Sequence, residues 1–446
     1  MTDHGDRQRK VRSRDLSAVD QRLLGQPLRL LPLYELPQVA DEPRSSGPTF
    51  TPGAGKRPGV LLRVGNNDLH FVCETIGEVI EPAGIVVALS DAPEVVRSAA
   101  RASRRVGVPL LTDTVFFRCA MPGGRISPSL ARLSYAPEPE HGPWTTADLG
   151  RTAVPGVVRA AFQEQDGRQH GAWMAPTVVI DRDPRTLELA DRLLASSIDT
   201  RPAFGRQPLV APLVIDLAAF SALDAQLRLV NALARHGPDV YLVSLAGTAT
   251  SGKRLASAIR LLMLLKDLGV PVLLAKAGAL RAFAIAFGLA GFESGLGRLD
   301  SFELSHFRGK GGAGRWPAYF EVPELLCAVH PQIAAQIARS GALGADCPCP
   351  GCREGWTPGD IRGTVVHDAF VINADARRGG GEISSMVAML KHSISDARYA
   401  VDELQEAGVD VSKQTAHLPR WAEAVELLVR WGLDEPGAAG RMRDAA

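Results

Sequence analysis

Short runs of apolar and β-branched residues recur along the first two thirds of the chain and alternate with longer segments of helical periodicity. Continuous apolar runs predict strands of a parallel sheet that is buried on both faces. Their alternation with helices predicts right-handed βα crossovers, with a repeat of about thirty residues. The predicted strands are Val60–Val64, Ile85–Leu89, Pro109–Thr112, Thr177–Ile180, Leu213–Ile215, Val240–Val243 and Val270–Ala275. The predicted helices between them are Ala92–Val106, Pro184–Ser196, Ala218–His236 and Gly252–Leu268. A closed barrel and an open doubly wound sheet both satisfy this α/β pattern.

After Phe292 the pattern changes and helices dominate. A helix is predicted near Pro331–Arg339, and a cluster of cysteines follows it. Two longer helical patterns then cover Ser384–Leu404 and Trp421–Trp431. We therefore expect a C-terminal helical segment that packs on the α/β region.

The composition excludes several classes of protein. Apolar residues make up 46% of the 446 residues, which is typical of a globular chain with a large core. No apolar stretch reaches membrane-spanning length, and no apolar signal segment follows Met1, so no membrane contact is expected. The net charge of +1 argues against a protein that coats nucleic acid, although a local basic groove is compatible with it. Six cysteines, half of them clustered, favour the reducing cytoplasm.

Three of those cysteines form a metal-binding pattern. Cys347, Cys349 and Cys352 lie in a Cys-x-Cys-x2-Cys segment, and His367 follows with Cys-x14-His spacing. Three thiolates and one imidazole complete a closed tetrahedral shell, which is typical of structural Zn²⁺. Cys327 and His330 lie upstream and compete as the fourth ligand. The simpler alternative is three reduced surface cysteines without a metal.

Polar residues follow most of the predicted strands. In a parallel barrel these positions gather at one mouth, where active sites of such barrels lie. Each carboxylate alone could be a helix N-cap, but several at successive strand ends repel one another and favour a functional site. The residues are Asp113, Asp181, Asp216, Ser244, Lys276 and Glu293.

These motifs resemble the tRNA-guanine transglycosylase family, of which the chain looks like a remote and degenerate member. The resemblance rests on the cysteine–histidine pattern, on Thr112-Asp113-Thr114 and on Gly291-Phe292-Glu293. It implies a TIM (β/α)8 barrel with a zinc-binding subdomain, and it favours the barrel over the open sheet. It also implies exchange of a guanine-type or 7-deazaguanine base in RNA or DNA. The family's Gly-Gly segment after the aspartate is replaced here by Val115-Phe116, and its nucleophilic aspartate by Glu293.

The resemblance also gives the strand-end residues roles. Glu293 corresponds to the nucleophile that forms a covalent intermediate, and Asp113 to the carboxylate that transfers the proton. Asp181, Asp216 and Ser244 correspond to positions that contact the base, although the family usually has a glutamine where Asp216 stands. A basic, glycine-rich loop in the place of the family's basic loop would contact phosphates and stack on a base. Its residues are Arg308, Lys310, Arg315 and Trp316.

A second motif resembles a phosphate-binding loop. Gly247-Thr248-Ala249-Thr250-Ser251-Gly252-Lys253-Arg254 follows a strand and opens a helix. Arg254 replaces the Ser or Thr that would hold Mg²⁺, and the next strand ends in Lys276 instead of a metal-binding aspartate. A barrel loop is therefore favoured over a nucleotide triphosphatase.

The prediction comprises a basic tail over residues 1–57, a transglycosylase-like barrel over 58–325, a zinc-binding subdomain over 326–375 and a helical segment over 376–446. The expected function is base exchange through a covalent carboxylate intermediate, with a free base and RNA or DNA as partners. The alternative is a non-catalytic zinc barrel that binds nucleic acid or serves as a partner subunit, in a homo- or heterodimer.

Overall fold

The computed structural model describes residues 48–51, 59–65, 77–150, 152–166, 171–276, 278–296, 302–308, 319–343, 347–353, 355–357, 360–377 and 383–435. Contacts divide the chain into Met1–Ala40 and Asp41–Ala446, and every described residue belongs to the second unit. Most of the tail predicted over residues 1–57 lies outside the described residues.

Parallel strands form a nearly closed barrel of eight strand positions, so the predicted TIM-barrel class is confirmed. The hydrogen-bonded order is β3-β2-β1-β9-β8-β7-β6-β4, and a bridge between Leu111 and Ala172 links its two ends. β4 and β5 both pair with β6 and are two parts of one barrel strand. The strands are β1 (Gly59–Arg63), β2 (Gly84–Ala88), β3 (Leu110–Asp113), β4 (Trp173–Met174), β5 (Val179–Ile180), β6 (Leu209–Asp216), β7 (Val240–Ala246), β8 (Val272–Ala275) and β9 (Gly291–Ser294).

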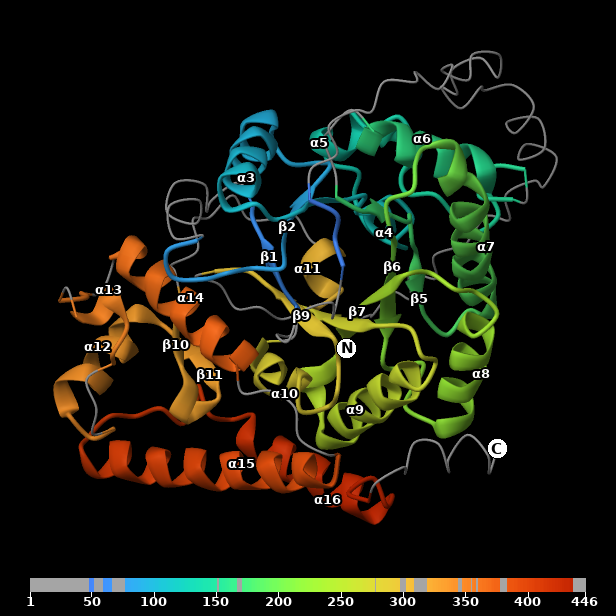
Figure 1. Ribbon diagram of the computed structural model, residues 1–446. Helices are drawn as coiled ribbons and strands as arrows, with labels where there is room; N and C mark the ends of the chain where they lie inside the picture. The colour runs from blue at the N-terminus through green and yellow to red at the C-terminus, as the bar shows by residue number, and fades with distance from the viewer. Residues whose placement is uncertain are drawn as a thin grey trace, which may run out of the picture. The chain divides into compact units, whose positions relative to one another are not determined.

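Helices surround these strands (Figure 1). The longer ones are α3 (Pro93–Val106), α6 (Val154–Asp166), α7 (Pro184–Thr200), α8 (Leu223–Leu233) and α9 (Gly252–Lys266). Short helices are α4 (Phe116–Cys119), α5 (Pro128–Ala131), α10 (Arg281–Ala284) and α11 (Ser305–Arg308). The sequence pattern did not single out α6, which begins with Val154-Pro155-Gly156 and therefore starts like a turn.

Alternate residues of the strands point into the barrel and fill it. Their side chains form a separate apolar core within the strands, made of Leu61, Val86, Leu111, Met174, Val210, Leu242 and Leu273, among others. Phe50 is 1% exposed, belongs to this core and donates its backbone N–H to the Gly171 carbonyl at 3.0 Å. Phe50 is therefore part of the barrel, although the polar, proline-rich residues around it led to its assignment to the tail.

The C-terminal part adds an antiparallel pair of strands and further helices. β10 (Phe320–Val322) pairs with β11 (Cys327–Val329). The helices are α12 (Pro331–Ser340), α13 (Pro350–Arg353), α14 (Ile361–Arg377), α15 (Ile383–Glu406) and α16 (Leu418–Arg430). Arg281 of α10 joins this part to the barrel through ion pairs with Glu321 and Asp375, both 3.1 Å long. None of the described helices combines the length and apolar character needed to cross a bilayer.

The seam between the first and last strands depends on two glycines. Gly59 of β1 faces Gly291 of β9 in the parallel register. A Cβ atom on Gly291 would lie 1.8 Å from the Gly59 carbonyl oxygen. Because the obstacle is backbone in a barrel strand, it cannot move aside as a flexible side chain would. Any side chain at position 291 would therefore separate the strands that close the barrel.

We expect Gly291→Ala to lower the free energy of unfolding by about 3 kcal/mol or more, as overpacking against backbone does. Gly295→Ala is the matched control, since a Cβ there meets nothing within 4 Å. Urea unfolding of both variants measures the difference. Equal stability of the two would contradict the described closure of the seam.

Candidate active site and metal centre

The guanidinium of Arg63 joins two of the predicted site residues at the C-terminal end of the barrel strands. Its Nε donates to Glu293 Oε1 at 2.6 Å, and its Nη2 donates to Glu293 Oε2 at 2.9 Å. The same Nη2 donates to Asp113 Oδ2 at 2.7 Å. Glu293 is fully buried, and the side chains of Arg63 and Asp113 are 20% and 14% exposed. Three strands, β1, β3 and β9, thus contribute one ion cluster.

The two carboxylates stabilise the charge on Arg63. Burial opposes the charge on Arg63, but Glu293 and Asp113 outweigh it and raise the pKa of the guanidinium above its usual value. One cation between two anions leaves an excess negative charge in a mostly buried place. Asp91, just after β2, lies in the field of Arg63 and Asp113, and burial raises the pKa of its carboxyl.

Arg63 was not predicted from the sequence. The predicted strand-end residues lie just past an apolar run, whereas Arg63 lies inside the run Val60–Val64 and ends β1. An arginine inside an apolar strand is a signal in itself, because such a buried charge requires a partner.

Aromatic side chains lie beside this mouth. Phe302 and Phe307 pack against Phe117, with ring centroids 5.8 and 5.3 Å away. The Lys276 ammonium, which follows β8, lies 5.4 Å from the Phe302 ring and 5.5 Å from the Phe307 ring. The Arg118 guanidinium lies 5.8 Å from the Phe307 ring. The mouth therefore combines carboxylates, cations and aromatic faces, a set that suits a flat, polar ligand.

Backbone strain concentrates at the same mouth. Among the described residues other than glycine, φ is positive at Val115, Lys276 and Leu326. Val115 (φ 45°) follows Asp113 and donates its N–H to Asp113 Oδ1 at 2.8 Å. Lys276 (φ 50°) donates its N–H to the Glu293 carbonyl. A left-handed conformation is costly for a β-branched residue, and such strain persists where the site requires a particular backbone path.

The other predicted base-contacting residues lie at the ends of neighbouring strands. Asp181 Oδ1 accepts from the Asp183 N–H at 2.9 Å and from the Thr186 hydroxyl at 3.2 Å, so it also caps the start of α7. Asp216 Oδ1 accepts from the Ala218 N–H at 2.9 Å. Ser244 is half-buried inside β7, which extends to Ala246. No described contact joins these three residues to the Arg63 cluster, and their contact with a base stays a prediction.

The loop that resembles a phosphate-binding motif is already occupied by protein groups. Ser251 caps α9 by accepting the Arg254 N–H, and Glu423 of α16 accepts the Gly252 N–H at 3.1 Å. A Cβ on Gly252 would lie 2.6 Å from the Arg420 carbonyl oxygen. A carboxylate therefore occupies the helix terminus where a phosphate would bind.

The basic loop lies mostly outside the described residues. Lys310, Arg315 and Trp316 are among the residues that are not described, and only the backbone of Arg308, at the end of α11, is described. Their phosphate contacts stay a prediction.

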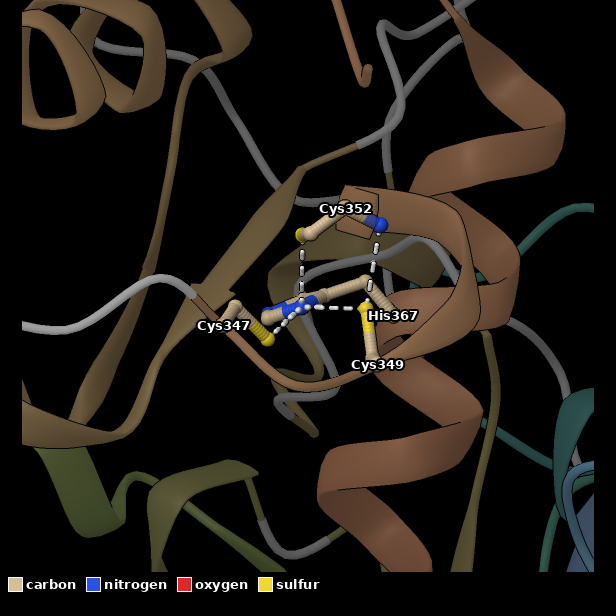
Figure 2. Close-up of side chains that lie close together, drawn as sticks. All are labelled: Cys347, Cys349, Cys352 and His367. Carbon is tan, nitrogen blue, oxygen red and sulfur yellow. Dashed lines mark hydrogen bonds between the residues drawn. The ribbon is translucent and has the colours of Figure 1, made fainter. Parts of the chain in front are cut away.

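The predicted metal ligands converge, as Figure 2 shows. The ligand atoms of Cys347, Cys349, Cys352 and His367 all lie within 4.8 Å of one another, and this group could bind a metal ion. The three sulfurs lie 3.3 to 3.5 Å from His367 Nδ1. Figure 2 shows them around one side of the imidazole. Cys327 and His330 do not join the group, and His330 instead caps α12 by accepting the Gln332 N–H at 3.3 Å.

A second layer of contacts orients His367. Its Nε2 donates to the Glu321 carbonyl at 2.8 Å, which leaves Nδ1 as the metal-binding nitrogen. Phe320 stacks on the imidazole with ring centroids 3.9 Å apart. His367 lies in the second turn of α14 and not at a helix start. Glu321 also binds Arg281, so the cluster is connected to the barrel.

The thiols of Cys347 and Cys352 influence each other's ionisation. Hydrogen bonds from Cys349 and Cys352 lower the pKa of the Cys347 thiol far below its usual value. The same contacts raise the pKa of Cys352 far above it, because one thiolate keeps its neighbours protonated. A bound metal ion removes this conflict by stabilising every thiolate at once.

Comparisons with known proteins identify no family for the chain. No protein-family model matches the chain, and no curated protein matches it. Among solved structures the chain is similar to a "putative fructose-1,6-biphosphate aldolase" from Coccidioides immitis. The identity is 12% over 72% of this chain and 92% of that chain, with a TM-score of 0.34. This likeness bears on neither activity nor substrate.

Replacement of Arg63 by Met should destabilise the protein by about 3–5 kcal/mol near neutral pH, because two buried carboxylates lose their cation. Urea unfolding at neutral pH measures the loss. Arg63→Met/Asp113→Asn/Glu293→Gln is the control and should recover most of it, because it removes both carboxylates together with the cation; a triple variant no more stable than Arg63→Met would contradict the ion cluster.

Purified protein should hold one metal ion per chain. Cys349→Ser should lose the ion and unfold the C-terminal part more easily, since a structural metal contributes folding free energy directly. Cys327→Ser is the matched control, because Cys327 lies nearby on β11 but outside the cluster, and it should keep the ion. Elemental analysis and thermal unfolding measure both effects. Full metal content in Cys349→Ser would refute the assigned ligand set.

Proposed function

We propose that the chain is an enzyme that exchanges a guanine-type base in RNA or DNA. One observation carries the proposal: Asp113 and Glu293 bind the same nitrogen, Arg63 Nη2, through bonds of 2.7 and 2.9 Å. Their oxygens are therefore separated by no more than the sum of these bonds. In enzymes that break glycosidic bonds by double displacement, the two carboxyl groups are about 5–5.5 Å apart. The pair also lies at the barrel end where catalytic residues of TIM barrels gather.

The two carboxylates would divide the chemistry. A Glu293 oxygen attacks the anomeric carbon as the bond to the base nitrogen breaks, and the bonding electron pair leaves with the base. The leaving base takes up a proton and the incoming base gives one up, and Asp113 is the group that transfers it. The incoming base nitrogen then attacks the same carbon and releases Glu293.

Arg63 would serve as the positioning residue for both. It holds Glu293 in place through two hydrogen bonds and sets the distance to Asp113. Each Glu293 oxygen accepts one hydrogen bond from Arg63. Because a carboxylate oxygen has two lone pairs, one lone pair on each oxygen remains for attack. Attack still requires substrate to approach a fully buried group.

Phe307 is the partly exposed ring of this group and would be the stacking surface for a purine, with Phe302 buried behind it. The cations of Lys276 and Arg118 near the Phe307 ring would add electrostatic contacts to a flat base. Asp181, Asp216 and Ser244 would then read the edge of the base. A base can reach such a pocket only after it is turned out of its stack.

We further infer that the metal is Zn²⁺ and that its role is structural. Three sulfur ligands and one nitrogen form the closed shell that Zn²⁺ prefers, and no ligand position is left for a substrate. The cluster also lies in the C-terminal part, in the segment 347–352 that leads into α13 and on α14, and not among the strand ends. Zinc should be the metal that elemental analysis finds.

A second candidate is a non-catalytic barrel that binds nucleic acid or a partner subunit. It is favoured by the same ion cluster, because Arg63 engages both Glu293 oxygens and Glu293 is fully buried. A glutamate that serves only to hold β1 and β9 together would show these contacts.

The two candidates differ in the formation of a covalent adduct. Wild-type protein, incubated with labelled tRNA or duplex DNA and a free guanine or 7-deazaguanine base, should form an adduct that survives a denaturing gel. Glu293→Gln should abolish the adduct, and Asp113→Asn should slow its formation at least about a hundredfold. Glu188→Gln, on the exposed face of α7, is the charge-matched control. Binding without adduct or base incorporation by the wild type would favour the non-catalytic candidate.

A further inference from the structure

A groove of about 620 Å³ lies on the outside of the barrel between α3 and the α5–α6 segment. Its floor is apolar and includes Leu89, Val96, Ala100 and Leu133. Its volume is within the range of about 300–1,000 Å³ that small-ligand sites occupy. None of the residues predicted from the sequence to bind a ligand lines it.

The walls of the groove are rich in arginine. Arg97, Arg101 and Arg104 recur at helical spacing on one face of α3, and Arg132 faces them from the end of α5. Two acidic residues also line the groove, and Arg97 pairs with the neighbouring Glu94 at 3.0 Å, so four arginines stand beside three acidic residues. Both acids that line the groove are engaged by backbone: Glu164 accepts the Ser134 N–H, and Asp91 accepts the Ala88 N–H, each at 3.0 Å.

The groove lies next to the barrel mouth. Leu89 and Asp91, which line it, follow β2, whose last residue, Ala88, pairs with Asp113 in the sheet register. Asp91 also lies in the field of Arg63 and Asp113. A ligand in the groove would therefore lie near the carboxylate pair.

We propose that this groove binds the sugar–phosphate backbone of a single-stranded nucleic acid, next to the nucleotide that enters the mouth. The assignment rests on the proposed base-exchange function. Arginine forks match phosphate oxygens, and the apolar floor accommodates the sugars. Arg97 to Arg104 spans about 10 Å at the helical rise, enough for about two successive phosphates. An acidic peptide also matches the positive charge of the groove, but it has no part that the carboxylate-lined mouth would bind.

The test compares two double variants that each remove two exposed arginines. Arg101→Gln/Arg132→Gln removes one cation from each wall of the groove. Arg228→Gln/Arg398→Gln, on the exposed faces of α8 and α15, makes the same charge change elsewhere. Binding of a labelled single-stranded oligonucleotide is measured by fluorescence anisotropy over a range of salt concentrations, and thermal unfolding verifies that both variants fold.

The groove variant should bind about tenfold more weakly, and the slope of log K against log salt should fall in magnitude by about 1.4, because two phosphate contacts are lost. The control should keep nearly the wild-type slope. Equal affinities and slopes in the two variants would overturn the proposal. Polyglutamate at equal charge that binds the wild type more tightly than the groove variant, while the oligonucleotide binds both equally, would also overturn it and assign the groove to an acidic peptide.

The outcome is separable from that of the proposed chemistry. The anisotropy assay contains no free base and does not depend on an adduct. Loss of binding in the groove variant without any adduct in the wild type would support the groove and refute base exchange. An adduct in the wild type together with unchanged binding in the groove variant would refute the groove alone.

Discussion

The barrel mouth depends on a single guanidinium. Arg63 binds Glu293 through two nitrogens and Asp113 through one of them, so one side chain of β1 fixes residues of β3 and β9. Burying an unpaired carboxylate costs several kcal/mol, which Glu293 avoids only through this contact. The contact also lies just above the Gly59–Gly291 seam, where two glycines let β1 and β9 approach. The pairing of β1 with β9 that closes the barrel therefore also places the two carboxylates.

A second buried arginine connects the metal cluster to the barrel. Arg281 of α10 binds Glu321 and Asp375, and the backbone carbonyl of Glu321 accepts the proton of His367 Nε2. The histidine that completes the cysteine cluster is thus oriented by a residue that is itself held by the barrel. A metal ion in the cluster would stabilise α14 and β10 together, and through Arg281 it would stabilise the segment that follows β8 and Lys276.

A C-terminal helix also closes the motif that resembles a phosphate-binding loop. The glycine-rich segment before α9 has the spacing of a phosphate-binding loop, yet Glu423 of α16 occupies the helix terminus. α16 is further held where Arg260 lies 4.3 Å from the Trp431 ring, which belongs to the residue just after the helix. Twelve of the fifteen residues of α9 are buried, including its first glycine. A motif that would be open on an isolated βα unit is closed by a helix more than 160 residues away in sequence.

The sequence by itself determined the parallel α/β pattern and the members of the cysteine–histidine cluster, whereas only the family resemblance favoured a closed barrel over an open sheet. Apolar runs in alternation with helices have a period that parallel strands require, and three cysteines within six positions need only local backbone bends to face one histidine. It also located Asp113 and Glu293, because residues at the ends of parallel strands meet at one mouth. It did not identify Arg63, the aromatic side chains beside the mouth or the arginine-lined groove beside α3, nor did it place Phe50 in the core. Those features join segments that are distant along the chain. Which strand closes on which, and which helix covers which terminus, is decided by side-chain packing in three dimensions, and local periodicity carries no record of that packing.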